Sequence, residues 1–122
     1  MKKVTGTLVA AAALVFAVSV PALAQDAKAQ QGAALFTAQK CTMCHSVAGK
    51  GNPKGSLDNI TAKNKAEHIK QWLTDPEGMR EKAHATRTPA MKPVKLTPDQ
   101  IDALVAYLTS IKADRAADDA GR

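Results

Sequence analysis

Aromatic side chains are scarce in this chain. Its 122 residues include two Phe, one Trp and one Tyr, 3% in all. Beyond the N-terminal stretch, only Phe36, Trp72 and Tyr107 remain, a thin supply for the core of a domain this size. Basic residues are not interleaved with aromatics, which argues against a nucleic-acid-binding protein. The centre of the fold therefore needs apolar surface from another source.

Cysteine is also scarce, and the two present are Cys41 and Cys44. No second C-x-x-C pair or His cluster completes a structural zinc site. No β-α-β pattern surrounds the pair, as a thioredoxin-like dithiol would require. A disulfide between the two residues would close a loop too short to constrain much of the chain. These absences weigh against three common uses of a C-x-x-C pair.

His45 follows the pair directly, so that residues 41–45 are Cys-Thr-Met-Cys-His. C-x-x-C-H is the attachment sequence of c-type haem. Two thiols at this spacing reach the two vinyl groups of a porphyrin, and the next imidazole is held under the iron. We predict one covalently bound haem c on Cys41 and Cys44, with His45 as an axial iron ligand. The porphyrin would supply the missing apolar surface, so we expect the haem-free chain to be mostly disordered.

Residues 1–24 have the pattern of a cleaved secretory signal peptide. Lys2 and Lys3 precede an uncharged apolar run at 8–20, and Ala22-Leu23-Ala24 provides small residues for cleavage. We expect a periplasmic protein that is not inserted in the membrane after cleavage. The alternative is a retained anchor, although a spanning helix needs roughly 20 apolar residues. Cleavage lowers the formal net charge of +6 by two, which leaves a mildly basic chain.

Residues 25–112 are predicted to form a single all-α domain, followed by a polar C-terminal tail at 113–122. We expect the tail to be frayed or disordered. Glycine and proline make 46–61 a loop, whose carbonyls could accept the His45 ring N–H that does not face the iron. No β-strand is evident.

Four helical segments are predicted, at 27–40, 64–74, 76–83 and from Thr97 onward. In the first, Gly32 and Phe36 lie on one face, where a glycine allows another helix to approach closely. Asn64 is the expected N-cap of the second, with Glu67 in a capping-box position. Trp72 is expected to pack in the core or at the haem edge. The last begins with a capping Thr and a Pro and has apolar residues on one face.

An electron carrier needs a second axial ligand opposite His45. Met91 lies between Pro89 and Pro93, which prevent a helix and hold the backbone extended, so its thioether can be presented at a fixed point. We predict that Met91 binds the iron, which raises the reduction potential relative to a second histidine. The alternatives are Met79, a histidine (His68 or His84) and an open site. Met43 is excluded because it lies on the His45 side.

These segments resemble class I cytochromes c, the small bacterial periplasmic type with one haem and His/Met ligation. The segments that carry the resemblance occur in the family's order: Gly32-x-x-x-Phe36, Cys41-x-x-Cys44-His45-Ser46, Trp72-Leu73-x-Asp75-Pro76, Pro89-Ala90-Met91-Lys92-Pro93, and Leu96-Thr97-x-x-x-Ile101-x-x-Leu104-x-x-Tyr107-Leu108. The resemblance implies the cytochrome c fold, with about four helices around the haem and the terminal helices crossing near Gly32, Phe36 and Tyr107. It also implies Met91 as the axial ligand.

Two segments depart from the family pattern. Gly55-Ser56-Leu57 stands where the family often has Gly-Pro-Leu, so the Ser56 carbonyl is expected to accept the His45 hydrogen bond in place of the proline carbonyl. The Met91 segment reads Thr-Pro-Ala-Met-Lys-Pro, unlike the commoner Thr-x-Met-Pro form.

The resemblance implies a soluble monohaem carrier that shuttles single electrons between Fe(II) and Fe(III), as in a respiratory chain, with no enzymatic activity. The expected partners are a reductase or dehydrogenase as donor and an oxidase or other protein as acceptor. Lysines flanking the haem segments could guide docking: Lys40, Lys50, Lys54, Lys63, Lys92 and Lys95. Two alternatives stay open: a haem enzyme or gas sensor with an open iron site, and a cytochrome subunit held in a larger dehydrogenase.

Overall fold

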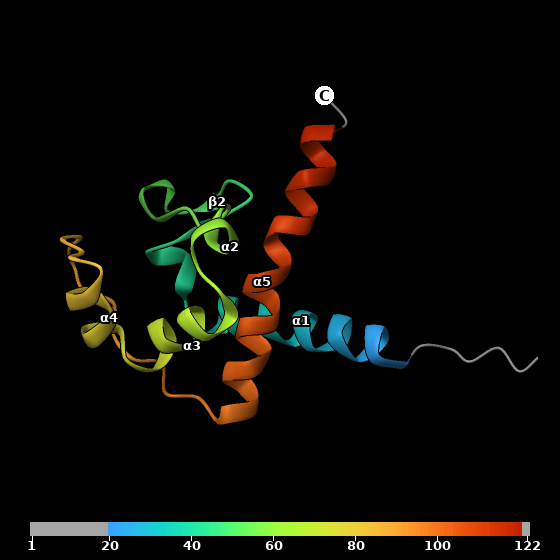
Figure 1. The fold of residues 1–122 in the computed structure, drawn as a ribbon, viewed down its shortest axis with the longest axis horizontal. Helices are drawn as coiled ribbons and strands as arrows, with labels where there is room; N and C mark the ends of the chain where they lie inside the picture. Colours follow the sequence, from blue (N-terminus) through green and yellow to red (C-terminus); the bar gives the residue numbers. More distant parts are fainter. Residues whose placement is uncertain (1–19, 121–122) are drawn as a thin grey trace, which may run out of the picture.

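The computed structural model describes residues 20–120, so most of the predicted signal peptide and the last two residues lie outside the described part. In chain order, the described elements are α1 (Val20–Ala38), η1 (Cys41–Met43), β1 (Ser46–Val47), β2 (Lys50–Gly51), η2 (Pro53–Gly55), α2 (Ile60–Lys63), α3 (Ala66–Thr74), α4 (Pro76–Lys82) and α5 (Pro98–Ala120). The predicted all-α class is confirmed, and α1 and α5 are the long helices (Figure 1). None of the helices in these residues is long and apolar enough to cross a membrane.

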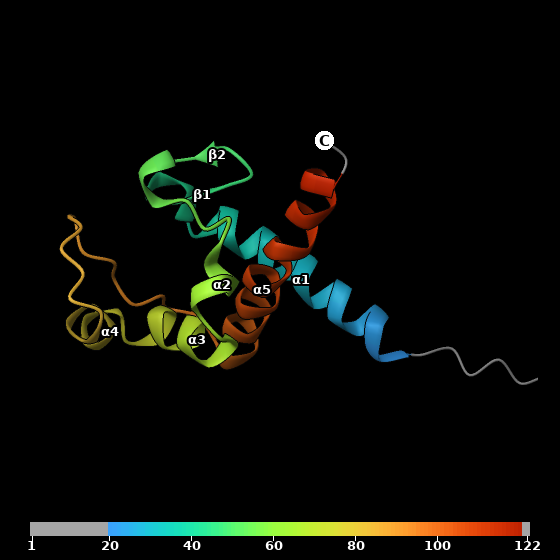
Figure 2. The same ribbon diagram turned by 45° about the horizontal axis from the view of Figure 1, so that its top comes forward.

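Helices α1 and α5 cross in both views of the molecule (Figures 1 and 2). Gly32 is buried at the crossing, where an added Cβ would lie 2.6 Å from the Ala103 carbonyl carbon and 2.7 Å from the Tyr107 Cβ. The Phe36 and Tyr107 rings meet beside it at 5.6 Å between centroids, inclined by 59°. The predicted crossing is therefore confirmed, and the glycine is required for the close approach of the two backbones.

The core is formed by Phe36 of α1 and by aliphatic residues of α3 and α5. Its buried side chains are Phe36, Ile69, Leu73, Ile101, Leu104, Leu108 and Ile111. The apolar spacing predicted for the last helix thus faces the core, and burying each such side chain contributes about 1.5–3 kcal/mol. Only one aromatic ring belongs to this set, in keeping with the composition.

The start of α3 differs from the sequence prediction. Asn64 does not cap α3 but ends α2, because its backbone N–H donates to the Ile60 carbonyl at 2.9 Å and its Nδ2 donates to the same oxygen at 3.2 Å. The N-cap of α3 is Lys65, whose side chain makes no capping bond. The predicted cap is wrong because the segment assigned to a loop already forms a helical turn at α2.

A short hairpin replaces part of the predicted loop. Strands β1 and β2 pair antiparallel around Ala48 and Gly49, whose φ angles are 50° and 76°. Two positive φ angles in succession are typical of the type I′ turns that join hairpin strands. The prediction of no strand is wrong here, because alanine rarely adopts this conformation and gave no turn signal.

The helices α4 and α5 agree with the predicted segments at their N-terminal ends. Pro76 starts α4 in its first turn. Thr97 and Gln100 form the reciprocal capping pair before α5, with bonds of 3.0 and 3.3 Å. Helix α5 continues to Ala120, so the expected disordered tail is contradicted as far as that residue. Alanine-rich sequence without an internal Gly or Pro favours this continuation.

Candidate functional site

The attachment sequence forms a tight turn immediately after α1. Lys40 adopts a left-handed conformation, with φ of 56°, and the N–H groups of Cys44 and His45 both donate to the Cys41 carbonyl, at 3.1 and 2.9 Å. Cys41 is half-buried and Cys44 is exposed, and no disulfide joins them. Burial raises the pKa of the Cys41 thiol. The structure therefore places both thiols and the imidazole on one turn, with no disulfide between the cysteines.

The His45 ring is oriented by the loop that follows it. Its Nδ1 lies 3.1 Å from the carbonyl oxygen of Gly55, an acceptor that requires the proton on Nδ1 and leaves Nε2 as the lone-pair nitrogen. Burial lowers the pKa of His45, which favours the neutral ring that binds metals. The expectation that Ser56 would provide this carbonyl is wrong. The η2 turn directs the Gly55 carbonyl at the ring, while the Ser56 hydroxyl donates to Asp58 at 2.7 Å.

Met91 and Cys41 lie against the same hydrophobic core. Both are partly buried and pack against the core side chains described above. Met79 is buried in α4 but does not belong to that core set. The side chains of His68 and His84 are exposed. Of the described candidates, Met91 is therefore the one placed against the same core as a haem cysteine, and its bond to iron stays a prediction.

Hydrogen bonds connect the segment that carries Met91 to the rest of the protein at several points. We call residues 83–97 the Met91 strap. Near its start, the Ala85 N–H donates to the Arg80 carbonyl, and the Arg80 Nε donates back to the Ala85 carbonyl, both at 3.0 Å. Near its end, the Val94 N–H donates to the Leu73 carbonyl of α3 at 3.0 Å. Between these points, Arg87 donates to the Cys44 carbonyl. These bonds give Met91 a defined position.

Two site residues were missed by the sequence analysis. The Gly55 carbonyl binds His45, and Arg87 crosses from the strap to the attachment turn. A carbonyl has no sequence signal of its own. Nothing in the sequence around Arg87 indicates contact with a residue 43 positions earlier. Both contacts form only when the attachment turn, the η2 turn and the strap are placed next to one another in the fold.

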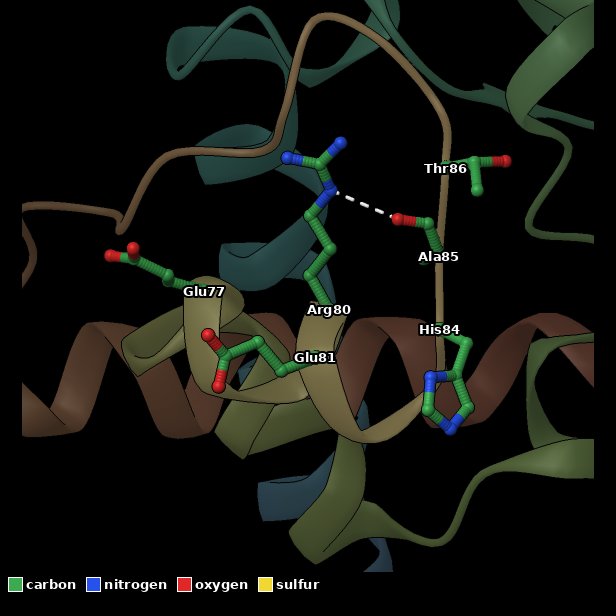
Figure 3. Close-up of a pocket in the computed structure, with 6 residues that line it drawn as sticks. All are labelled: Glu77, Arg80, Glu81, His84, Ala85 and Thr86. Atoms are coloured by element: carbon green, nitrogen blue, oxygen red, sulfur yellow. Dashed lines mark hydrogen bonds between the residues drawn. The ribbon is translucent and has the colours of Figure 1, made fainter.

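A separate polar cavity of about 580 Å³ lies between α4 and the beginning of the strap. Its lining residues, drawn in Figure 3, are Glu77, Arg80, Glu81, His84, Ala85 and Thr86. The Arg80 side chain spans one side to reach the Ala85 carbonyl (Figure 3). Of the residues predicted or considered as iron ligands, only His84 lines it. The described residues contain no cluster of three or more His, Cys, Asp or Glu that could hold a metal ion.

The residues of the attachment turn suit a covalently bound haem. Two cysteines and an oriented imidazole occupy one turn, and the core behind Cys41 is apolar.

Comparisons with known proteins agree with this site. The sequence profile of the cytochrome c family matches residues 29–112, which is more than half of the chain. The fold is similar to that of a cytochrome c from Rhodothermus marinus, with a TM-score of 0.59 and 24% identity over 80% of this chain and 87% of that one. An engineered form of the Rhodothermus marinus protein bound to a carbene intermediate has a TM-score of 0.53 and 26% identity, over 72% of this chain and 80% of that one.

A curated relative is a longer protein. Cytochrome c oxidase subunit 2 of Alkalihalophilus pseudofirmus is 28% identical over an alignment of 93 residues, which covers 69% of this chain. The chain spans only about a quarter (26%) of that relative. The profile match over residues 29–112, together with the C-x-x-C-H turn, shows that the chain belongs to the cytochrome c family, whose haem c is covalently attached.

Proposed function

We propose that this cytochrome c is a one-electron carrier with no catalytic reaction of its own. The observation that carries the proposal is the packing of Met91 and Cys41 against one core, with His45 oriented by Gly55. Cys41 and Cys44 would hold the ring, and His45 Nε2 and the Met91 sulfur would fill the two axial positions. Bound haem supplies an iron that changes by one electron. With both positions filled, the protein would offer no open site to a substrate.

The test is the absorption spectrum of the oxidised holoprotein. We expect the oxidised wild type to show the long-wavelength charge-transfer band of Met-ligated Fe(III), and Met91→Ala to lose it and, once reduced to Fe(II), to bind CO readily. Met79→Ala is the matched control and should keep the band. An unchanged band in Met91→Ala would overturn the ligand assignment. Ready CO binding by the wild type would favour a haem enzyme or gas sensor.

We further propose that partners dock through lysines near the haem. All six lysines named above are exposed: Lys40, Lys50, Lys54, Lys63, Lys92 and Lys95. A positive surface accelerates association with an acidic partner, and added salt screens the attraction. The similarity to an oxidase subunit supports an oxidase as acceptor. Electron-transfer rates should fall as ionic strength rises, whereas a flat profile would argue against lysine steering.

The predicted signal pattern supports a periplasmic location. Mass spectrometry of the mature protein should show an N-terminus at Gln25, and fractionation should recover haem protein from the periplasm. An intact N-terminus in the membrane fraction would favour the retained anchor instead.

A second candidate is a cytochrome subunit of a larger complex. The relative that is an oxidase subunit favours it, because there the similar region belongs to a longer chain. A free carrier should elute at monomer size from a gently lysed extract, whereas a subunit should co-purify with catalytic protein.

A further inference from the structure

Arg87 connects the Met91 strap to the haem-attachment turn. Its guanidinium Nη2 donates to the carbonyl oxygen of Cys44, a residue 43 positions earlier in the chain. The other strap bonds given above reach only α3 and α4. Among these bonds, only the one from Arg87 joins the Met91 strap to the attachment turn that carries the two cysteines.

The same guanidinium packs on Gly55. A Cβ added to Gly55 would lie 2.9 Å from the Arg87 Cζ and would also collide with its Nη1 and with the Cys44 carbonyl. The missing side chain at position 55 therefore provides the space that the guanidinium occupies. Because the Gly55 carbonyl binds the His45 ring, Arg87 contacts the residue before His45 and the residue that orients it.

This placement brings a permanent positive charge close to His45. Arginine stays protonated at any physiological pH, and the Arg87 guanidinium is held against Cys44, the residue before His45, and against Gly55, whose carbonyl binds the His45 ring. An iron bound by this ring carries one more positive charge when oxidised than when reduced. A fixed cation nearby therefore disfavours Fe(III) relative to Fe(II), by an amount that depends on distance and local dielectric.

We propose that Arg87 is a positioning residue that fastens the Met91 strap to the attachment turn and raises the reduction potential of the haem. The proposal rests on the proposed one-electron function. Its guanidinium suits both tasks, because a planar fork holds a carbonyl in a fixed direction while keeping the charge in place.

The test compares Arg87→Gln and Arg87→Lys with wild-type holoprotein, and uses Lys95→Gln as a matched control. Lys95 is an exposed residue of the same strap. Its substitution removes an equal charge but leaves the contacts with Cys44 and Gly55 in place. Two readouts are needed: the Fe(II)/Fe(III) ratio at a fixed ambient potential, and the denaturant concentration at which the Met–Fe(III) band disappears.

For Arg87→Gln, we expect the Fe(II)/Fe(III) ratio to fall about three- to tenfold, where tenfold corresponds to about 59 mV for one electron. Lys95→Gln should change it less than about twofold, because Lys95 makes none of the contacts with Cys44 and Gly55 that bring the Arg87 charge next to His45, and water and salt screen a more distant surface charge. Arg87→Lys should retain most of the ratio but lose the band at lower denaturant than wild type, since an ammonium cannot reproduce the planar fork.

Equal ratios in Arg87→Gln and Lys95→Gln would overturn the electrostatic role. A band as resistant to denaturant in both Arg87 variants as in wild type would overturn the positioning role. Failure of the proposed function is recognised separately, because the wild-type protein itself would then lack the Met–Fe(III) band. The ratio comparison can still be made with any second axial ligand.

Discussion

At the scale of single residues, two kinds of hydrogen bond hold the loop after the attachment turn. One joins the His45 ring to Gly55, and the others are made by the carboxylate of Asp58. Asp58 is buried, with 6% of its surface exposed. Its carboxylate accepts hydrogen bonds from the Ala48 N–H and the Ser56 hydroxyl, both at 2.7 Å. It thereby joins the hairpin turn to the end of η2, the turn that presents the Gly55 carbonyl to His45.

Replacing Asp58 should destabilise this loop. Asp58→Ala leaves the Ala48 N–H and the Ser56 hydroxyl without their acceptor, and hydrogen bonds to a charged group contribute about 1.5–3 kcal/mol each. We expect a loss of about 3 kcal/mol or more in the free energy of unfolding, measured by denaturant titration of the holoprotein. Ser56→Ala removes one bond and should cost less. Equal stability of Asp58→Ala and wild type would show that water replaces these contacts.

Asp102 gives a pH dependence of known sign. It forms an exposed ion pair with Lys70 at 2.7 Å, and the hydrogen bond from Lys70 lowers the pKa of Asp102. Since the pKa is lower in the folded state, the pair stabilises the fold above the usual Asp pKa and ceases to do so as the pH falls through the lowered value. Asp102→Asn should slightly flatten the acid side of the stability profile, and a profile of unchanged slope would contradict this.

At the scale of elements, the α1–α5 crossing depends on a position without a side chain. Gly32 faces Ala103 and Tyr107 of α5, while Phe36, one turn further along α1, packs on the Tyr107 ring. Close approach and ring contact together determine how the two long helices cross. The strap and the attachment turn are both built outward from this crossing, because α1 leads into the turn and the strap leads into α5.

Gly32→Ala should therefore force α1 and α5 apart. Overpacking in a core costs about 1–3 kcal/mol, and here the obstructing atoms belong largely to backbone, so we expect the upper part of that range. Thermal unfolding of the holoprotein would measure the effect. Gly49→Ala serves as a control, because its Cβ would meet nothing within 4 Å and only its φ of 76° would resist. A milder effect at Gly32 than at Gly49 would contradict the packing argument.

At the scale of the whole molecule, the helices form the buried core and the loops contribute little to it. The buried side chains come from α1, α3 and α5, while the strap and the hairpin contribute only partly buried residues such as Val47, Met91 and Val94. These loops have few apolar contacts of their own. Their order should therefore depend on the covalently attached haem of this family.

The double variant Cys41→Ala/Cys44→Ala, which cannot attach haem, should consequently lack most of the native structure. We expect low helical content in circular dichroism and no cooperative melting, since apolar burial by the helices alone does not offset the entropy of ordering the loops. Native-like helical content with a sharp melting transition would show that the polypeptide folds without its cofactor.

The sequence by itself determined the parts of this protein whose physics is local. Five consecutive residues at 41–45 specify haem attachment, because thioether chemistry requires only that spacing. The apolar spacing of α5 and its Thr97 cap depend on neighbours within one or two helical turns. Gly32 and Phe36 could be assigned to the helix crossing because the family resemblance indicated that they meet Tyr107 of the last helix.

Tertiary structure alone decided the contacts between segments that are far apart in the chain. Gly55, rather than Ser56, binds His45, because the η2 turn sets the direction of each carbonyl. Asn64 ends α2 instead of starting α3, since a turn that has no sequence signal precedes it. Arg87 reaches Cys44 because the fold brings its long side chain within reach of the attachment turn. Such contacts depend on how loops are placed in space, and side-chain spacing along the chain carries no record of that placement.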